Sequence, residues 1–197
     1  LLVGSEGTLG IFTKIILRLL PQPAATAVLL IPFGSAAEAV AAFPQVIAKA
    51  GILPSAIEFM DRLSVEGVYR YLSEEPPRPD IGAMLLIEID GSSRERVDEE
   101  CQRIGELFLE ASALDVYVGN TPATERKMWR PRISLAEAFK VLNPIQSIED
   151  IVVITARIPD LVRELERLAA AYDVLIPCYG HAGDGNLHAT PLKKPET

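Results

Sequence analysis

The sequence predicts an α+β fold in which an antiparallel sheet carries helices mainly on one face and is extended by extra strands and helices. Three observations support this expectation. Of the 197 residues, 49% are apolar, which is enough for a substantial core. Short β-branched runs alternate with segments whose apolar residues follow helical spacing. Glycine, proline and helix-capping residues separate these segments.

The beginning of the chain differs from the rest. "GSEGTLG" at 4–10 predicts a glycine-rich turn, and the apolar run "IFTKIILRLL" at 11–20 is typical of a strand. The prolines of "PQP" at 21–23 then break the chain. We therefore expect a domain boundary here, between residues 1–23 and residues 24–197.

Strands and helices are expected to alternate over the next hundred residues. Strands are expected at 26–33, 55–60, 83–90 and 114–119, and helices at 35–50, 61–72 and 92–112. Capping residues support two of these helices, Ser35 with Glu38 and Ser92 with Glu95. Pro44 predicts a kink or a break in the first helix.

The order of these elements predicts a topology. Strand-helix-strand, an extra helix, and then strand-helix-strand is the order of a ferredoxin-like antiparallel sheet. Beyond it we expect a long helix at 122–142, a strand at 149–155, a helix with Leu161 and Leu165 on its apolar stripe, and a strand at 174–180. These later elements are expected to extend the same sheet.

Composition excludes several classes of function. The formal charge of −8, from 19 Lys and Arg against 27 Asp and Glu, argues against nucleic-acid binding. An anionic substrate would therefore need a local Arg or Lys. The two cysteines form no CxxC pair, and Cys101 lies on the apolar stripe of an expected helix, which favours a buried thiol and a reducing compartment. We identify no transmembrane segment and no signal peptide.

Both histidines of the chain lie in one short segment, "YGHAGDGNLH" at 179–188. Its glycines allow the backbone to fold back on itself, so that His181 and His188 could converge on one side, near the helix of Arg132. Two neutral imidazoles could then hold a divalent ion, completed by Asp184 or by a distant carboxylate. The alternative is a surface turn whose histidines are incidental.

Two further segments carry candidate binding groups. The glycine-rich turn at 3–11 could present backbone N–H groups to a phosphate or to a flat ring system, although an ordinary tight turn has the same pattern. In "KMWRPRISLAEAFK", Arg132 suits bidentate capture of a carboxylate. The alternative is a solvated helix face, which we accept for Lys127 and Arg130.

Together these segments resemble the flavin-dependent D-2-hydroxyacid dehydrogenases of the vanillyl-alcohol-oxidase superfamily. This family includes D-lactate dehydrogenases, the FAD subunit of glycolate oxidase and D-2-hydroxyglutarate dehydrogenases. "VGSEGTLGIFTKIILRLLP" resembles its segment that closes the FAD-binding domain, and "WRPR", "IEDIVVITARIPDLV" and "GHAGDGNLH" resemble its substrate-domain motifs in the same order. The resemblance implies that residues 1–23 are the C-terminal edge of the FAD-binding domain. Residues 24–197 would be the FAD-linked oxidase C-terminal (substrate or cap) domain, truncated at its C-terminus.

The resemblance also implies roles for single residues. His181 and His188 match metal ligands, for a divalent ion such as Zn or Mn. Arg132 matches the residue that binds the substrate carboxylate, and Asn186 matches one close to substrate and flavin. The residues that match backbone-rich FAD contacts are Gly4, Ser5, Gly7, Thr8, Gly10 and Ile11. A Glu-His pair, with the third metal ligand and the base, is expected beyond residue 197.

The implied activity is oxidation of a small anionic D-2-hydroxy acid to the 2-oxo acid by hydride transfer to FAD. The 197-residue chain alone is expected to be inactive. The implied electron acceptor is a protein or a quinone, or an iron-sulfur subunit, and the expected location is cytoplasmic or peripheral to the membrane through a partner. Ala136 replaces a Thr of the D-2-hydroxyglutarate members, and their Lys before "EDVVVP" is lost among Gln146 and Ser147, which argues against that substrate.

Two alternatives remain, and one of them belongs to another class of protein. One is a non-catalytic, ferredoxin-like ligand-binding module with an inert histidine loop. The other is a different flavoenzyme of the same superfamily, acting on ether-lipid precursors or aromatic alcohols, against which the metal-type loop argues.

Overall fold

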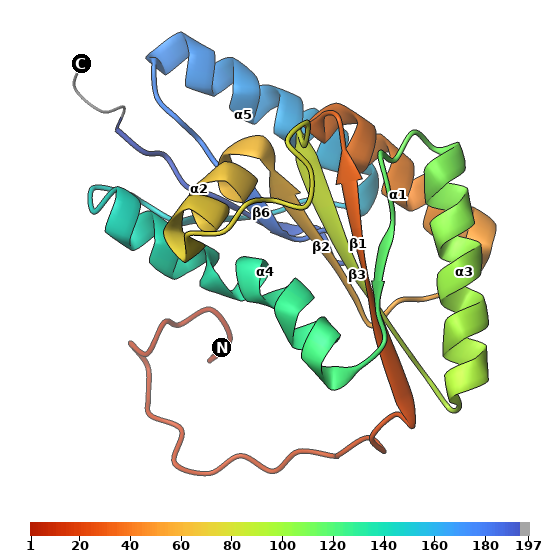
Figure 1. Ribbon diagram of the computed structural model, residues 1–197. Helices are drawn as coiled ribbons and strands as arrows, with labels where there is room; N and C mark the ends of the chain where they lie inside the picture. The colour runs from red at the N-terminus through yellow and green to blue at the C-terminus, as the bar shows by residue number, and fades with distance from the viewer. Residues whose placement is uncertain (194–197) are drawn as a thin grey trace.

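A single antiparallel sheet organises the computed structural model, which describes residues 1–193 (Figure 1). In the described chain its strands are β1 (Ala25–Phe33), β2 (Ala56–Asp61), β3 (Ala83–Gly91), β4 (Tyr117–Gly119), β5 (Glu149–Val152), β6 (Cys178–His181) and β7 (Asn186–Ala189). The helices are α1 (Ala36–Ala50), α2 (Arg62–Leu72), α3 (Arg94–Glu110), α4 (Pro122–Leu142) and α5 (Ile158–Tyr172), with a 3₁₀ turn at Thr155–Arg157.

The strand order confirms the predicted topology. It is β4-β1-β3-β2-β6-β7-β5, and its first four members have the ferredoxin-like arrangement. The remaining strands extend the same sheet from the β2 edge, as expected. Because β2 pairs with β6, residues near position 58 lie beside the histidine segment although more than a hundred residues separate them in sequence.

Helices cover both faces of the sheet. α1, α3 and α5 pack on one face, so the expected one-sided layer exists, but α2 and α4 form a second layer on the other face (Figure 1). The reason is visible in the central strands. β1 and β3 are buried almost continuously rather than at alternate residues, so both of their faces need an apolar cover.

Local signals predicted the helix boundaries well. Ser35 caps α1 by accepting a hydrogen bond from Glu38 N, and Pro44 lies within α1 without interrupting it. The second cap is Ser93 rather than Ser92, because β3 runs on to Gly91 and the side chain that accepts from Arg96 N is that of Ser93.

The strand predictions were less accurate, since the strands expected at 114–119 and 149–155 are shortened to β4 and β5. Residues 11–20 form no strand and are exposed. No strand of residues 1–193 pairs with them, so their backbone N–H and C=O groups can hydrogen-bond only to water. The strand expected at 174–180 is confined to β6. Residues 186–189, which we had assigned to a loop, form β7.

Nothing among the helices of the described chain has the length and apolar character needed to cross a membrane. The end of the expected domain, at residue 197, lies outside the described residues.

Candidate functional site

The segment that contains both histidines is a β-hairpin. β6 and β7 pair so that Tyr179 lies opposite His188 and His181 lies opposite Asn186. The turn between them is closed by a hydrogen bond from Gly185 N to the carbonyl oxygen of His181, 3.0 Å. Gly185 has a φ of +84°, and a Cβ on it would lie 1.8 Å from the carbonyl oxygen of Val153, so glycine is required there.

The hairpin brings both imidazoles to one face of the sheet, as predicted. Directly opposed residues in an antiparallel ladder share a face, and residues two apart along a strand do so as well. The centroids of the His181 and His188 rings are 6.0 Å apart. This face is the one covered by α4, whereas Leu187 and Cys178 point into the core on the other side.

Asp184 does not form a group with His181 and His188 that could hold a metal ion, which was one of the two arrangements considered. Its carboxylate accepts a hydrogen bond from the backbone N of Asn186, 3.0 Å, and so stabilises the turn.

A buried carboxylate joins His181 to Arg132. Glu58, on β2, lies directly opposite His181, and its Oε1 is 2.6 Å from Nδ1 of that ring. Its other oxygen, Oε2, accepts a hydrogen bond from Nε of Arg132, also 2.6 Å, and the side chains of Glu58 and Arg132 are 5% and 12% exposed. The Arg132 guanidinium carbon lies 5.4 Å from the centroid of the Tyr179 ring. The predicted substrate anchor and a predicted metal ligand are therefore part of one cluster.

His188 has a carboxylate partner of its own. Asp150, on β5, lies opposite His188, and its Oδ1 is 2.5 Å from Nδ1 of the ring. Both imidazoles thus use Nδ1 for a carboxylate, which leaves Nε2 of each available. Histidines that bind metals commonly donate their other N–H in this way.

The structure shows no metal site in the part of the chain that it describes. Between residues 1 and 193, no group of three or more His, Cys, Asp or Glu side chains could hold a metal ion. A divalent ion held by His181 and His188 therefore stays a prediction.

Asn186 lies on the same face as these side chains. Its Oδ1 is buried and has no hydrogen-bond partner within residues 1–193. Buried polar atoms are almost always paired, so this oxygen fits a position that a ligand or another segment completes.

Sequence reasoning missed Glu58, Asp150 and Tyr179. A glutamate inside the short apolar strand "SAIEFM" was a usable signal, because charged residues are rarely buried without a partner. Asp150 and Tyr179 carried no comparable signal. Burial raises the pKa of Tyr179, so its phenol stays protonated and is a poor candidate for a base.

The other candidate residues on α4 are on the surface. Arg130 forms an exposed ion pair with Glu74, and Lys127 is exposed, which agrees with the solvated face expected for both.

The six residues expected to contact FAD lie in the exposed N-terminal segment. Gly4 and Gly7 both have a φ of +77°, and Thr8 N donates to the carbonyl oxygen of Ser5, 2.9 Å, so the expected tight turn is present. Within residues 1–193, nothing lies within 4 Å of a Cβ built on Gly4, Gly7 or Gly10. The structure shows the turn, and FAD binding by it stays a prediction.

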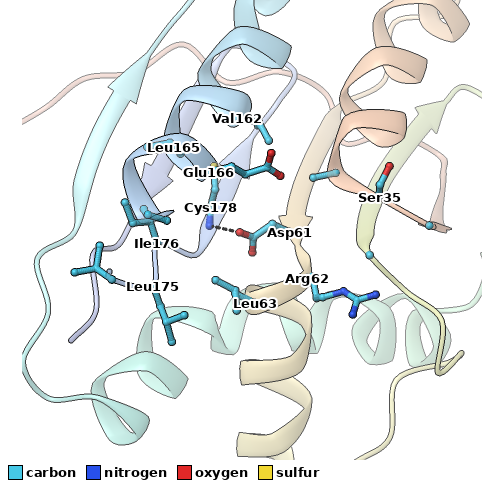
Figure 2. Close-up of a pocket in the computed structure, with 15 residues that line it drawn as sticks. Ser35, Asp61, Arg62, Leu63, Val162, Leu165, Glu166, Leu175, Ile176 and Cys178 are labelled. Carbon is cyan, nitrogen blue, oxygen red and sulfur yellow. Dashed lines mark hydrogen bonds between the residues drawn. The ribbon is translucent and has the colours of Figure 1, made fainter. Parts of the chain in front are cut away.

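A separate cavity of about 300 Å³ lies on the opposite face of the sheet, between α1, α2 and α5 (Figure 2). Its half-buried Asp61 caps α2 by accepting a hydrogen bond from Ser64 N and accepts a second one from Cys178 N, both 2.8 Å. Burial raises the pKa of Asp61 to about 6. Both oxygens of this carboxylate already accept a hydrogen bond from the backbone.

Neither cysteine has the character of a reactive thiolate. Burial, and after it the carboxylate of Asp61, raise the pKa of Cys178, and burial raises the pKa of Cys101 to about 11. Both thiols are free and buried, as the sequence predicted for Cys101.

Comparison with known proteins assigns the family. The pattern of the family described as "FAD linked oxidases, C-terminal domain" matches residues 22–197, so the chain belongs to this family. It is 36% identical over 193 residues to the D-lactate dehydrogenase of Anaerostipes hadrus, a match that covers 95% of this chain and 40% of that protein. It is 34% identical over 188 residues to the glycolate oxidase subunit GlcD of Escherichia coli K12, covering 95% of this chain and 37% of that protein. The chain spans about two fifths of the length of these relatives.

Solved structures support the fold. Alkyldihydroxyacetonephosphate synthase superposes with a TM-score of 0.63 at 18% identity, over 97% of this chain and 40% of that one. p-Cresol methylhydroxylase superposes with a TM-score of 0.64 at 14% identity, over 89% of this chain and 40% of that one. The family resemblance drawn from the motifs is therefore confirmed, and these two structures show the fold alone.

Proposed function

We propose that the protein oxidises a small D-2-hydroxy acid, of the lactate or glycolate type, to the 2-oxo acid by hydride transfer to FAD. The observation that carries this proposal is the single cluster formed by Arg132, Glu58, His181 and His188 on one face of the sheet. A cationic anchor beside two imidazoles suits a substrate whose carboxylate and hydroxyl are on adjacent carbons. The names of the relatives, D-lactate dehydrogenase and glycolate oxidase subunit, support the same substrate class.

Arg132 would bind the substrate carboxylate. Nε of Arg132 is engaged by Glu58, so the terminal nitrogens of the guanidinium are the groups that can donate to a carboxylate. Because this side chain is 12% exposed, water competes weakly for it and the hydrogen bonds would be stronger than on the open surface.

His181 and His188 would hold a divalent ion, such as Zn or Mn, through their Nε2 atoms. Such an ion, when bound, would lower the pKa of the substrate hydroxyl. Glu58 and Asp150 would keep the two rings oriented for this role, and Asn186 would contact the substrate through its unpaired oxygen. The glycine-rich turn at 4–10 would contribute backbone contacts to FAD, which accepts the hydride.

The electron acceptor of the reduced flavin is proposed to be a protein or a quinone, with an iron-sulfur subunit as one form of it. A cytoplasmic location, free or at the membrane through such a partner, fits this proposal.

The competing hypothesis of a non-catalytic module gives no reason for the observed cluster. Such a module would have no use for two carboxylate–imidazole pairs on one face beside a buried amide oxygen that is left unpaired at a cost to folding. A flavoenzyme for ether-lipid precursors or aromatic alcohols would not need the pair of histidines.

Anaerobic mixing of the full-length protein with candidate substrates tests the proposal. D-Lactate or glycolate should bleach the absorbance of oxidised flavin, and L-lactate should leave it unchanged. D-2-Hydroxyglutarate should react poorly, because Ala136 and the Gln146–Ser147 stretch lack the groups matched in those members. An oxidised flavin in the presence of every 2-hydroxy acid would overturn the proposal.

A further inference from the structure

Glu58 contacts both Arg132 and His181, and nothing in the sequence motifs pointed to it. We propose that Glu58 is a positioning residue, whose carboxylate holds the guanidinium of Arg132 and the imidazole of His181 in a fixed relation. This inference rests on the proposed function for its consequence in catalysis, but its geometric part does not depend on that function.

The first argument is the number of hydrogen-bond acceptors. Arg132 Nε and His181 Nδ1 each lie 2.6 Å from a different oxygen of the same carboxylate. Both nitrogens face an acceptor, so both must carry a hydrogen. A carboxylate has two acceptor oxygens and can satisfy both donors, whereas an amide of the same shape has only one. Glutamine at position 58 could therefore accept a hydrogen bond from only one of these two nitrogens.

The second argument concerns the tautomer of His181. A carboxylate oxygen accepts hydrogen bonds, so when the ring carries a single N–H the hydrogen lies on Nδ1, which faces Oε1, and Nε2 carries the lone pair. Glu58 thereby determines which nitrogen of His181 can act toward a ligand. Glutamine could donate its own N–H to Nδ1 and reverse this choice.

The third argument is charge. The Glu58 and Arg132 side chains are 5% and 12% exposed, so their charges are poorly screened by water and largely offset one another. Removing the negative charge would leave the guanidinium more attractive to an anion. Substrate affinity should therefore hold while the geometry of the cluster is lost.

A pair of matched variants in the full-length flavoprotein tests this. Glu58→Gln should lower kcat by about 10–100-fold, the usual effect of losing an orienting partner of this kind, while KM changes far less. Glu88→Gln is the control. Glu88 lies on the same face of the sheet as Glu58 and accepts a hydrogen bond, 2.8 Å, from Trp129, which is on α4 like Arg132. It makes no hydrogen bond to Arg132 or His181. This variant should leave both constants unchanged. Equal effects of the two variants would overturn the proposal.

A second measurement separates this inference from the proposed function. Nuclear magnetic resonance of isotope-labelled histidine reports the tautomer of each ring, and the chain has only two histidines to assign. The 197-residue chain should show His181 protonated on Nδ1, and Glu58→Gln should shift it toward the Nε2-protonated form. Glu58→Asp keeps both acceptor oxygens and should retain the wild-type tautomer.

The outcomes are distinct. A wild-type His181 protonated on Nε2 would overturn the inference even if the enzyme oxidises 2-hydroxy acids. Conversely, the expected tautomers in a protein that reduces no flavin would support the geometry and overturn only the proposed reaction. Should Glu58→Gln fail to fold, the wild-type and Glu58→Asp spectra still decide the question.

Discussion

Asp150 lies directly opposite His188 in the β5–β7 ladder, with its Oδ1 2.5 Å from Nδ1 of the imidazole. This relation repeats that of Glu58 and His181, but the environments differ. The Asp150 side chain is 68% exposed, whereas that of Glu58 is 5% exposed. The two carboxylates should therefore differ in how much the protein depends on them.

Asp150→Asn is expected to be nearly neutral. Exposed ion pairs contribute about 0–1 kcal/mol, and the asparagine oxygen can still accept from Nδ1 of His188. The loss in kcat/KM of the full-length enzyme for a D-2-hydroxy acid should therefore stay within about 1 kcal/mol. A loss as large as that caused by Glu58→Gln would show that exposure does not distinguish the two carboxylates.

Arg132→Ala should raise KM for 2-hydroxy acids, because it removes a charge-assisted contact from a side chain that is largely shielded from water. We expect kcat/KM to fall by an amount equivalent to about 2–4 kcal/mol. Steady-state kinetics of the full-length protein measure it, and Lys127→Ala, on the exposed side of the same helix, is the control. Similar losses for both would mean that the substrate binds elsewhere.

Gly185→Ala should destabilise the chain. A left-handed φ alone costs a residue with a Cβ about 1–2 kcal/mol, and here the Cβ would also lie 1.8 Å from the carbonyl oxygen of Val153. Gly183, two residues away in the same turn, has no left-handed φ, and its Cβ would meet Ile57 at an ordinary 3.5 Å. Urea unfolding should therefore show a clear loss for Gly185→Ala and a much smaller one for Gly183→Ala. The reverse order would mean that the turn has another geometry.

How much the sequence could predict depended on how local the signal was. Helices such as α1 and α4 were placed to within a residue or two, because caps and apolar spacing lie inside the segment itself. The run at 11–20 failed as a strand because a strand requires a partner that local sequence cannot reveal. β7 was missed because its strand character also depends on distant partners. Its residues look like a loop, and only the pairing with β6 and β5 makes them a strand.

The same limit applies to the site. Arg132, His181 and His188 could be singled out from residue type and spacing. Glu58 could not be connected to them, because its contact with His181 depends on the register in which β2 pairs with β6. A shift of one residue would turn that carboxylate to the other face of the sheet.

The last prediction concerns the pH dependence of stability. Burial raises the pKa of Asp61 from 3.8 to about 6, so the folded chain holds this proton more tightly than the unfolded chain. The stabilisation by protonated Asp61 is thus fully present below about pH 4 and is lost as the pH rises through about 6. Since one pKa unit corresponds to about 1.4 kcal/mol, this contribution amounts to about 3 kcal/mol.

Asp61→Asn removes this dependence, because the amide does not titrate in this range. The stability advantage of the wild-type chain over Asp61→Asn, from urea unfolding at a series of pH values, should therefore shrink between about pH 4 and pH 6 and then level off. Asp80 supplies a control of opposite sign: its hydrogen bond with Arg78 lowers its pKa, so any contribution it makes is present above its unfolded pKa and lost as the pH falls. Asp80→Asn should accordingly leave the change between pH 4 and 6 intact. A wild-type advantage over Asp61→Asn that grows with pH would instead mean that the backbone N–H groups of Ser64 and Cys178 stabilise the ionised carboxylate more than its burial destabilises it.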